Sequence, residues 1–151
     1  YGVDLQITAG ALLLKFESIY RDAIAQKFFA FDAGFEFTFT NIDKNGLDIG
    51  VLGEYLYDER GDWSISGLQD DIFYGIRVAF NDTQDTAILA GGIHDLETNT
   101  NLFTIEGSRR FKKNFVVSLE TRVFSGISEE ERFLLFFKQD SLINLSVSKY
   151  F

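Results

Sequence analysis

The sequence predicts an all-β protein, an antiparallel up-and-down sheet of about nine strands that closes into a barrel. Apolar and polar residues alternate along almost the whole chain, as they do where the side chains of a strand point to opposite faces in turn. Short and long connections also alternate between the runs, which is typical of successive hairpins. The 151 residues, 1–151, fit one domain, because no linker or low-complexity tract divides them.

The composition narrows the classes of protein that fit. The chain has 23 acidic and 14 basic residues, which argues against nucleic acid as a partner because phosphates require Lys and Arg. It has no Cys, which excludes disulfides, thiolate metal sites and a Cys nucleophile. No apolar run reaches the ~18 residues that a membrane-spanning helix needs. The chain starts at Tyr1 without a signal-peptide pattern, which favours a processed chain or a part of a longer one.

Strands are expected from the first residues to the last. Residues 29–40 (FAFDAGFEFTFT) are the clearest, with Phe or Ala at every odd position and mostly polar residues at the even ones. In residues 1–21 the polar positions change from even to odd, which predicts two strands joined by a turn or bulge at residues 9–11. The other strands are expected at residues 47–58, 71–81, 86–96, 101–111, 115–125 and 141–151. In the weakest run, residues 86–96, the apolar face is expected to contain Ala87, Leu89 and Ile93.

The connections alternate in length. The tight ones mostly contain turn-forming residues and lie at residues 9–11, 43–46, 82–85 and 112–114. The others are mostly longer and polar and lie at residues 22–26, 59–70, 97–100 and 126–140. Because alternate connections of an up-and-down sheet lie at the same end, we expect one end with short turns and one end with long loops.

Periodicity leaves two ways for the sheet to face. The apolar side chains point inward in a soluble barrel and outward to lipid in a membrane barrel. Residues 29–39 alone would place five Phe rings inside a small barrel, whose interior needs a mixture of large and small residues. This volume argument favours the lipid-facing arrangement. Aromatic residues near strand ends, where interfacial girdles form, agree with it: Tyr55, Tyr57, Tyr74, Phe111, Phe115, Tyr150 and Phe151.

Residues 141–151 (SLINLSVSKYF) form an alternating run whose last residue is aromatic. This run resembles the terminal strand of Gram-negative outer-membrane β-barrel proteins. The resemblance implies a periplasmic C-terminus, an outer-membrane location and recognition of the last strand by the barrel-assembly machinery, through Leu145, Val147, Tyr150 and Phe151. Residues 54–62 (EYLYDERGD) and 79–86 (AFNDTQDT) are also similar to a group of proteobacterial outer-membrane proteins to which no activity is attached.

The strand count departs from this family. Single-chain bacterial barrels have an even number of strands, whereas nine are expected here. We favour the interpretation that the chain is the C-terminal part of a larger barrel, because Tyr1 begins directly in a strand. A complete eight-stranded barrel is the alternative.

The polar face carries the main candidate site, a charged lumen. Its ten acids are Asp4, Glu17, Asp32, Glu36, Asp48, Glu54, Asp58, Asp71, Glu106 and Glu120. Its five bases are Lys15, Arg21, Arg77, Arg110 and Arg122. Charges in a barrel interior must be paired or hydrated, and the same-strand pairs Lys15/Glu17, Glu106/Arg110 and Glu120/Arg122 suit a ladder of ion pairs. A narrow barrel would make this network a plug, and a wider one a pore that favours cations.

Three short motifs are weaker. His94, the one His of the chain, could act as a base, but residues 92–96 (GIHDL) provide no Ser beside it, so a residue of the barrel wall is favoured. Residues 41–46 (NIDKNG) resemble the start of a calcium loop, yet its twelfth position is Leu52 instead of an acid, so a hairpin turn is favoured. The adhesion tripeptide Arg60-Gly61-Asp62 is attributed to chance.

Two further features belong to the long loops. An acidic rim, which could hold divalent cations that bridge lipopolysaccharide, is attributed to solvated loops: Asp58, Glu59, Asp62, Asp70, Asp71, Glu129, Glu130 and Glu131. Residues 132–137 (RFLLFF) do not alternate. They are expected to pack on the barrel, with contact to a partner protein as the alternative.

The expected role is non-enzymatic, without cofactor or metal: a passive channel for small hydrophilic solutes. A closed structural barrel that presents its outer loops to a partner protein is the second hypothesis. A lipid-modifying barrel enzyme and a soluble barrel with an apolar cavity follow.

Overall fold

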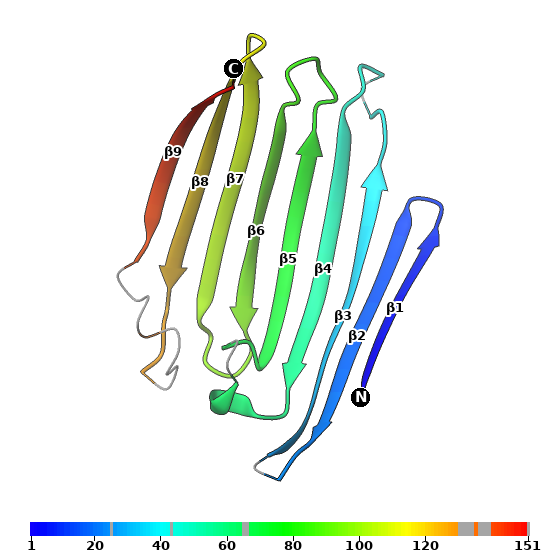
Figure 1. Ribbon diagram of the computed structural model, residues 1–151, viewed down its shortest axis with the longest axis vertical. Helices are drawn as coiled ribbons and strands as arrows, with labels where there is room; N and C mark the ends of the chain where they lie inside the picture. Colours follow the sequence, from blue (N-terminus) through cyan, green and yellow to red (C-terminus); the bar gives the residue numbers. More distant parts are fainter. Residues whose placement is uncertain (25, 43, 65–66, 130–134, 136–139, 151) are drawn as a thin grey trace.

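The computed structural model describes residues 1–24, 26–42, 44–64, 67–129, 135 and 140–150. It is one antiparallel sheet in which each strand pairs with the next along the chain (Figure 1). The strands are β1 (Gly2–Ala9), β2 (Leu12–Asp22), β3 (Lys27–Phe39), β4 (Asp48–Asp58), β5 (Asp70–Ala79), β6 (Ala87–Asp95), β7 (Asn101–Phe111), β8 (Phe115–Ser125) and β9 (Leu142–Lys149). A 3-10 turn, η1 (Gly61–Trp63), interrupts the connection between β4 and β5. Within the described part of the chain, the prediction of an all-β up-and-down sheet of nine strands is confirmed, one strand more than the eight-stranded alternative has.

The prediction that one end has short turns and the other long loops is only partly correct. The connections at the upper end of Figure 1, which we call the short-turn end, lie at residues 10–11, 40–47, 80–86 and 112–114. Those at the lower end, the long-connection end, lie at residues 23–26, 59–69, 96–100 and 126–141, so two of them are shorter than two of the upper ones. Gly10 has the positive φ of +62° that a tight turn between β1 and β2 requires. Asp82 organises the turn between β5 and β6, because its carboxylate accepts bonds from the backbone amide and the hydroxyl of Thr86, at 2.8 and 2.7 Å. These bonds hold the pKa of Asp82 below its usual value.

The sheet is open, so the expected closure into a barrel is not observed. Among the described residues, β1 pairs with β2 and β9 pairs with β8, and each leaves its other edge without a partner strand. The two edge strands run in the same direction, since the chain enters β1 at the lower end and leaves β9 at the upper end (Figure 1). No helix of the described residues is long and apolar enough to cross a membrane.

The register divides the sheet into two unlike faces. Phe35 of β3 lies opposite Leu14 of β2 and Gly53 of β4, on what we call the aromatic face. Its neighbour Glu36 lies opposite Leu13 and Leu52, on what we call the charged face. The aromatic face has no second layer over it: Phe35 is 45% exposed, Ile76 49% and Leu145 67%. The buried apolar side chains among the described residues are instead Phe28 and Ile127.

Aromatic rings hold the aromatic face together. Phe31 lies at the centre of a cluster in which ring centroids are 5.5 to 6.1 Å apart, with Phe16, Phe29, Tyr55 and Tyr57 around it. Other rings cover glycines: a Cβ at Gly53 would lie 3.0 Å from the Phe35 ring, and one at Gly92 would lie 2.9 Å from the Tyr74 hydroxyl. These glycines are therefore the positions at which rings lie flat on the backbone.

The faces predicted for β6 are wrong. Ala87, Leu89 and Ile93 lie opposite Ala79, Arg77 and Phe73 of β5, so they belong to the charged face. The aromatic face of β6 contains Ile88, Ala90, Gly92 and His94. Period two could not decide, because β6 is apolar at both odd and even positions. The pairing with β5 fixes the register, and a shift of one residue exchanges the faces.

Candidate functional site: an acidic row on the charged face

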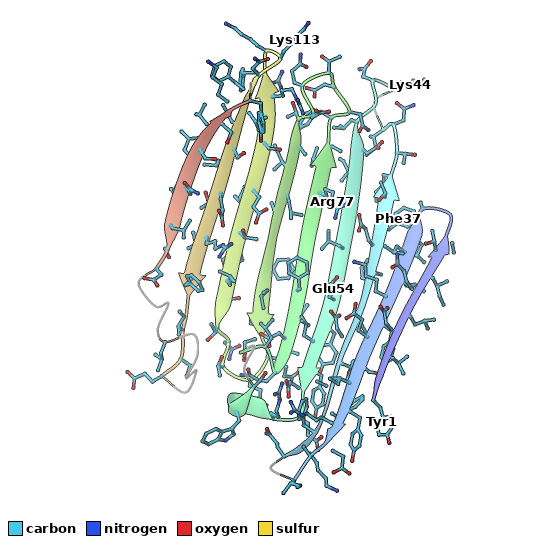
Figure 2. The ribbon with its side chains drawn as sticks, viewed as in Figure 1. Tyr1, Phe37, Lys44, Glu54, Arg77 and Lys113 are labelled. Carbon is cyan, nitrogen blue, oxygen red and sulfur yellow. The ribbon has the colours of Figure 1, made fainter. Side chains whose placement is uncertain are left out.

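The register places the ten acids and five bases of the candidate lumen on one face of the sheet. In Figure 2, Glu54 and Arg77 lie in the middle of this face, away from Lys44 and Lys113 in the short turns. The proposed lumen set therefore shares a surface, although the open sheet does not enclose it. The residues of this set that we expect to line a lumen are Lys15, Glu17, Asp32, Glu36, Asp48, Glu54, Arg77, Glu106, Arg110, Glu120 and Arg122.

Five acids form one row across six strands near the long-connection end. Successive pairing partners are Asp4, Glu17, Asp32, Leu56, Asp71 and Asp95, one from each of β1 to β6. We call these five acids the acidic row. Cβ atoms of directly opposite residues are about 5 Å apart, and like charges at that spacing destabilise a sheet. The row therefore costs stability and is the strongest candidate for a functional feature.

An open hollow of ≈ 720 Å³ lies along the first half of the acidic row. Carboxylates of Asp4, Glu17 and Asp32 contribute to its wall, together with the apolar side chains of Leu56 and Leu68. The hollow can hold hydrated cations beside three carboxylates. Among the described residues, no group of three or more His, Cys, Asp or Glu side chains is arranged to hold a metal ion.

Two ion pairs on the charged face reach across glycines. Lys15 of β2 lies 4.0 Å from Glu54 of β4, with Gly34 of β3 between them. A Cβ at Gly34 would lie 2.4 Å from Cγ of Glu54, so a side chain there would displace Glu54. Arg77 of β5 similarly reaches Glu36 of β3 at 3.2 Å, past Gly50 of β4. Glycine in these strands thus lets bases reach acids two strands away.

The ladder of ion pairs expected between Lys15/Glu17, Glu106/Arg110, Glu120/Arg122 and their neighbours forms only in part. Arg122 binds Glu120 at 2.7 Å, as predicted. Lys15 instead pairs with Glu54, and Arg110 pairs with Asp85 in the turn between β5 and β6 at 3.1 Å. The reason for the Lys15 pair is space: Gly34 has no side chain between Lys15 and Glu54, so the two side chains meet across β3.

The end of the sheet with long connections holds a buried polar cluster. Arg60 donates from Nε to Asp58 at 2.8 Å, and its guanidinium lies 3.9 Å from the ring centroid of Phe28. Ser64 donates to the same carboxylate at 3.0 Å. The bonds to Asp58 raise the pKa of Arg60 above its usual value. This cluster fixes residues 59–64 over the charged face, because Phe28 and Asp58 both belong to it.

Asp71 and Asp95 are the functional candidates that the sequence analysis placed poorly. They lie directly opposite each other on β5 and β6, and each is 1% exposed. The sequence places Asp71 both among the acids of the charged lumen and in the solvated rim, whereas its side chain is buried. Asp95 was not singled out, because it shares its odd position with Leu89 and Ile93, which were assigned to the wrong face. The register of β6 is the signal that the sequence lacks.

The other predicted residues occupy simpler places. His94 lies on the aromatic face, with Nδ1 2.9 Å from Oδ1 of Asn101. Asp48 accepts a bond from the backbone amide of Asn41 at 2.8 Å and another from Asn81, so it fixes the short turns. Leu145 and Val147 are exposed on the aromatic face of β9, and Tyr150 follows it. Phe151 and, except for Leu135, residues 132–137 lie outside the described residues, as do Glu130 and Glu131.

Comparison of the chain with protein-family models, curated proteins and solved structures gives no match. Function must therefore be argued from the two faces and from the acidic row.

Proposed function

We propose that the chain forms part of the wall of an outer-membrane β-barrel in a Gram-negative bacterium, and that the barrel is a passive channel for small hydrophilic solutes with a preference for cations. The observation that carries the proposal is the contrast between the faces. One face exposes large aromatic and aliphatic side chains without a covering layer, and the other carries acids and bases at every level. Contact with lipid stabilises the exposed apolar side chains of the first face, and contact with water hydrates the charges of the second.

The aromatic face supports the lipid side of the proposal. An apolar surface of this extent in water would be a site of aggregation. Toward the long-connection end, Tyr55 donates its hydroxyl to Asp70 at 2.7 Å, and toward the short-turn end Phe37 and Phe39 pack edge to face. Aromatic residues toward both ends of the strands suit the two borders of an apolar band.

Closure of the barrel requires further strands under this proposal. Because β1 and β9 run in the same direction, an odd number of additional strands is needed if every neighbour is to be antiparallel. The total is then even, as in bacterial barrels. This supports the interpretation of the chain as the C-terminal part of a larger barrel. The short turns and the C-terminus then lie in the periplasm, and the long connections face lipopolysaccharide outside.

The acidic row supports the cation preference. A ring of carboxylates at a pore mouth raises the local concentration of cations and repels anions. The test is the permeability of K⁺ relative to Cl⁻ across planar bilayers. We expect cation selectivity in the original protein and a severalfold loss of it in the double variant Glu17→Gln with Asp32→Asn. The control is Asp22→Asn, which removes a charge paired with Lys27 outside the row. Equal selectivity of all three proteins would contradict the proposal.

A closed structural barrel is the second candidate, and one row of side chains favours it. Beside the acidic row, Phe73, Ile93, Leu102 and Phe124 are successive partners on the charged face of β5 to β8. Four large apolar side chains in one row suit a filled interior better than a water-filled one. A stably folded protein that shows no conductance would favour this role, in which the long connections would contact a partner protein.

A further inference from the structure

One connection folds over the charged face. We call residues 59–64 and 67–69, the described part of the link between β4 and β5, the cover. The cover contacts buried side chains of the charged face at three points. Arg60 lies over Phe28, Arg60 and Ser64 bind Asp58, and Gln69 donates from Nε2 to Asp95 at 3.3 Å. The cover is also tied to β3, since Glu59 accepts a bond from the backbone amide of Phe29 at 2.9 Å.

Asp71 and Asp95 lie where the cover returns to the sheet. The two residues are direct pairing partners on adjacent strands, on the same face of the sheet, and each is 1% exposed. Asp95 Oδ1 accepts bonds from the backbone amides of Glu97 and Thr98, and its Oδ2 accepts the bond from Gln69. Asp71 Oδ2 is buried and, among the described residues, has no hydrogen-bond partner. A buried acceptor without a donor is costly.

The charges around this pair do not neutralise it. Toward β4, Asp71 faces Leu56, with Glu54 and Asp58 on either side along the same face. Lys15 lies beside Glu54 and Arg60 binds Asp58, so the nearby bases serve other acids. Toward β6 the charged neighbour is Asp95, and Asp70 precedes Asp71 on the opposite face. Burial away from water, together with the nearby charge of Asp95, favours the protonated form of the Asp71 carboxyl group.

We propose that Asp71 and Asp95 form a proton-operated clasp that holds the cover against the charged face. With one proton, the hydroxyl of Asp71 becomes a donor toward Asp95, and the like charges no longer repel. Loss of that proton to solvent leaves two buried carboxylates and releases the cover. The clasped state binds more protons than the released one, so its stability falls as the pH rises. In the proposed channel, to which this inference adds regulation, the cover would narrow the outer mouth at low pH.

Trypsin cleavage after Arg60 measures release of the cover, and cleavage at Lys112 and Lys113 in the distant turn between β7 and β8 is the internal reference. The folded protein in detergent micelles, with a chelator present, is digested between pH 5 and pH 8. We expect the ratio of the two cleavage rates to rise with pH, by at most about tenfold per unit for a single proton. Asp71→Asn places an amide donor at the unsatisfied position and should give a low ratio at every pH.

The matched control is Asp70→Asn, one residue away on the opposite face, which should keep the pH dependence of the original protein. A ratio that does not change with pH in the original protein, or an Asp71→Asn variant that still responds to pH, would overturn the clasp. Conductance across bilayers separates the two proposals. A pH-dependent cleavage ratio without conductance at any pH supports the clasp and refutes the channel. Conductance together with a cleavage ratio that does not change with pH supports the channel and refutes the clasp.

Discussion

Phe35→Lys tests which medium touches the aromatic face. Phe35 lies opposite Gly53, midway between Ile49 and Tyr57 on the aromatic side of β4, and its ring covers that glycine. If this face meets lipid, the lysine lies near the bilayer midplane, where such a substitution costs roughly 2–4 kcal/mol. At ~3 kcal/mol, the ratio of folded to unfolded protein falls about 150-fold. If the face meets water, the charge is easily hydrated.

Thr38→Lys is the matched control, three residues along the same strand on the charged face. There the new lysine lies two residues from Glu36 on the same face of β3. We expect the free energy of unfolding to change by no more than about 1 kcal/mol. The assay is equilibrium unfolding in urea from lipid vesicles, followed by far-ultraviolet circular dichroism. Equal costs for the two lysines would refute the facing on which the channel proposal rests. So would a detergent-free original protein that is soluble and monomeric.

Three further predictions concern other parts of the sheet. Gly91→Ala should destabilise the fold by about 1–3 kcal/mol in the same assay, because its Cβ would lie 2.6 Å from the carbonyl oxygen of Tyr74; Gly107→Ala, whose Cβ would meet nothing closer than 3.8 Å, should be tolerated. Arg77→Gln should increase the K⁺ over Cl⁻ permeability ratio by releasing Glu36, now 3.2 Å from the guanidinium, and an unchanged ratio would place Glu36 outside the permeation path. Because the pKa of Asp82 is lowered by its bonds to Thr86, the turn should be stable above pH 3.8, the ordinary value, and weaken as the pH falls below it; hydrogen exchange at the Thr86 amide measures this, with Asp82→Asn as the variant insensitive to pH.

The strands could be predicted from the sequence wherever one face is purely apolar. In residues 29–40 the Phe residues at odd positions fix both the strand and its faces, and the observed β3, Lys27–Phe39, differs by two residues at its start and one at its end. In β6 apolar residues occupy both parities, so the strand was predicted and its faces were not. Closure depends on a partner for the edges of β1 and β9, which the alternation of these residues does not specify.

The candidate site was predictable as a face but not as an arrangement. Strand parity is enough to place Glu17, Asp32 and Glu54 on the same side. The contact between Lys15 and Glu54 depends on the register of three strands and on the missing side chain of Gly34. The facing of Asp71 and Asp95 depends on the register of β6, the strand that periodicity leaves undecided. The contacts within the site therefore require the pairing register of several strands, which the sequence pattern alone does not provide.

The segregation of charges argues that the acidic row is more than a by-product of a polar lumen. Five bases share the charged face, and one of them opposite Glu17 would relieve the repulsion between Asp4, Glu17 and Asp32. The chain instead pairs its central bases with other acids, Lys15 with Glu54 and Arg77 with Glu36. Asp4, Glu17 and Asp32 are thereby left as direct neighbours with no base between them. In the proposed clasp, neighbouring carboxylates of this kind favour the protonated form of Asp71. Under the two proposals, the attraction of cations and the control of the cover both follow from the placement of these acids.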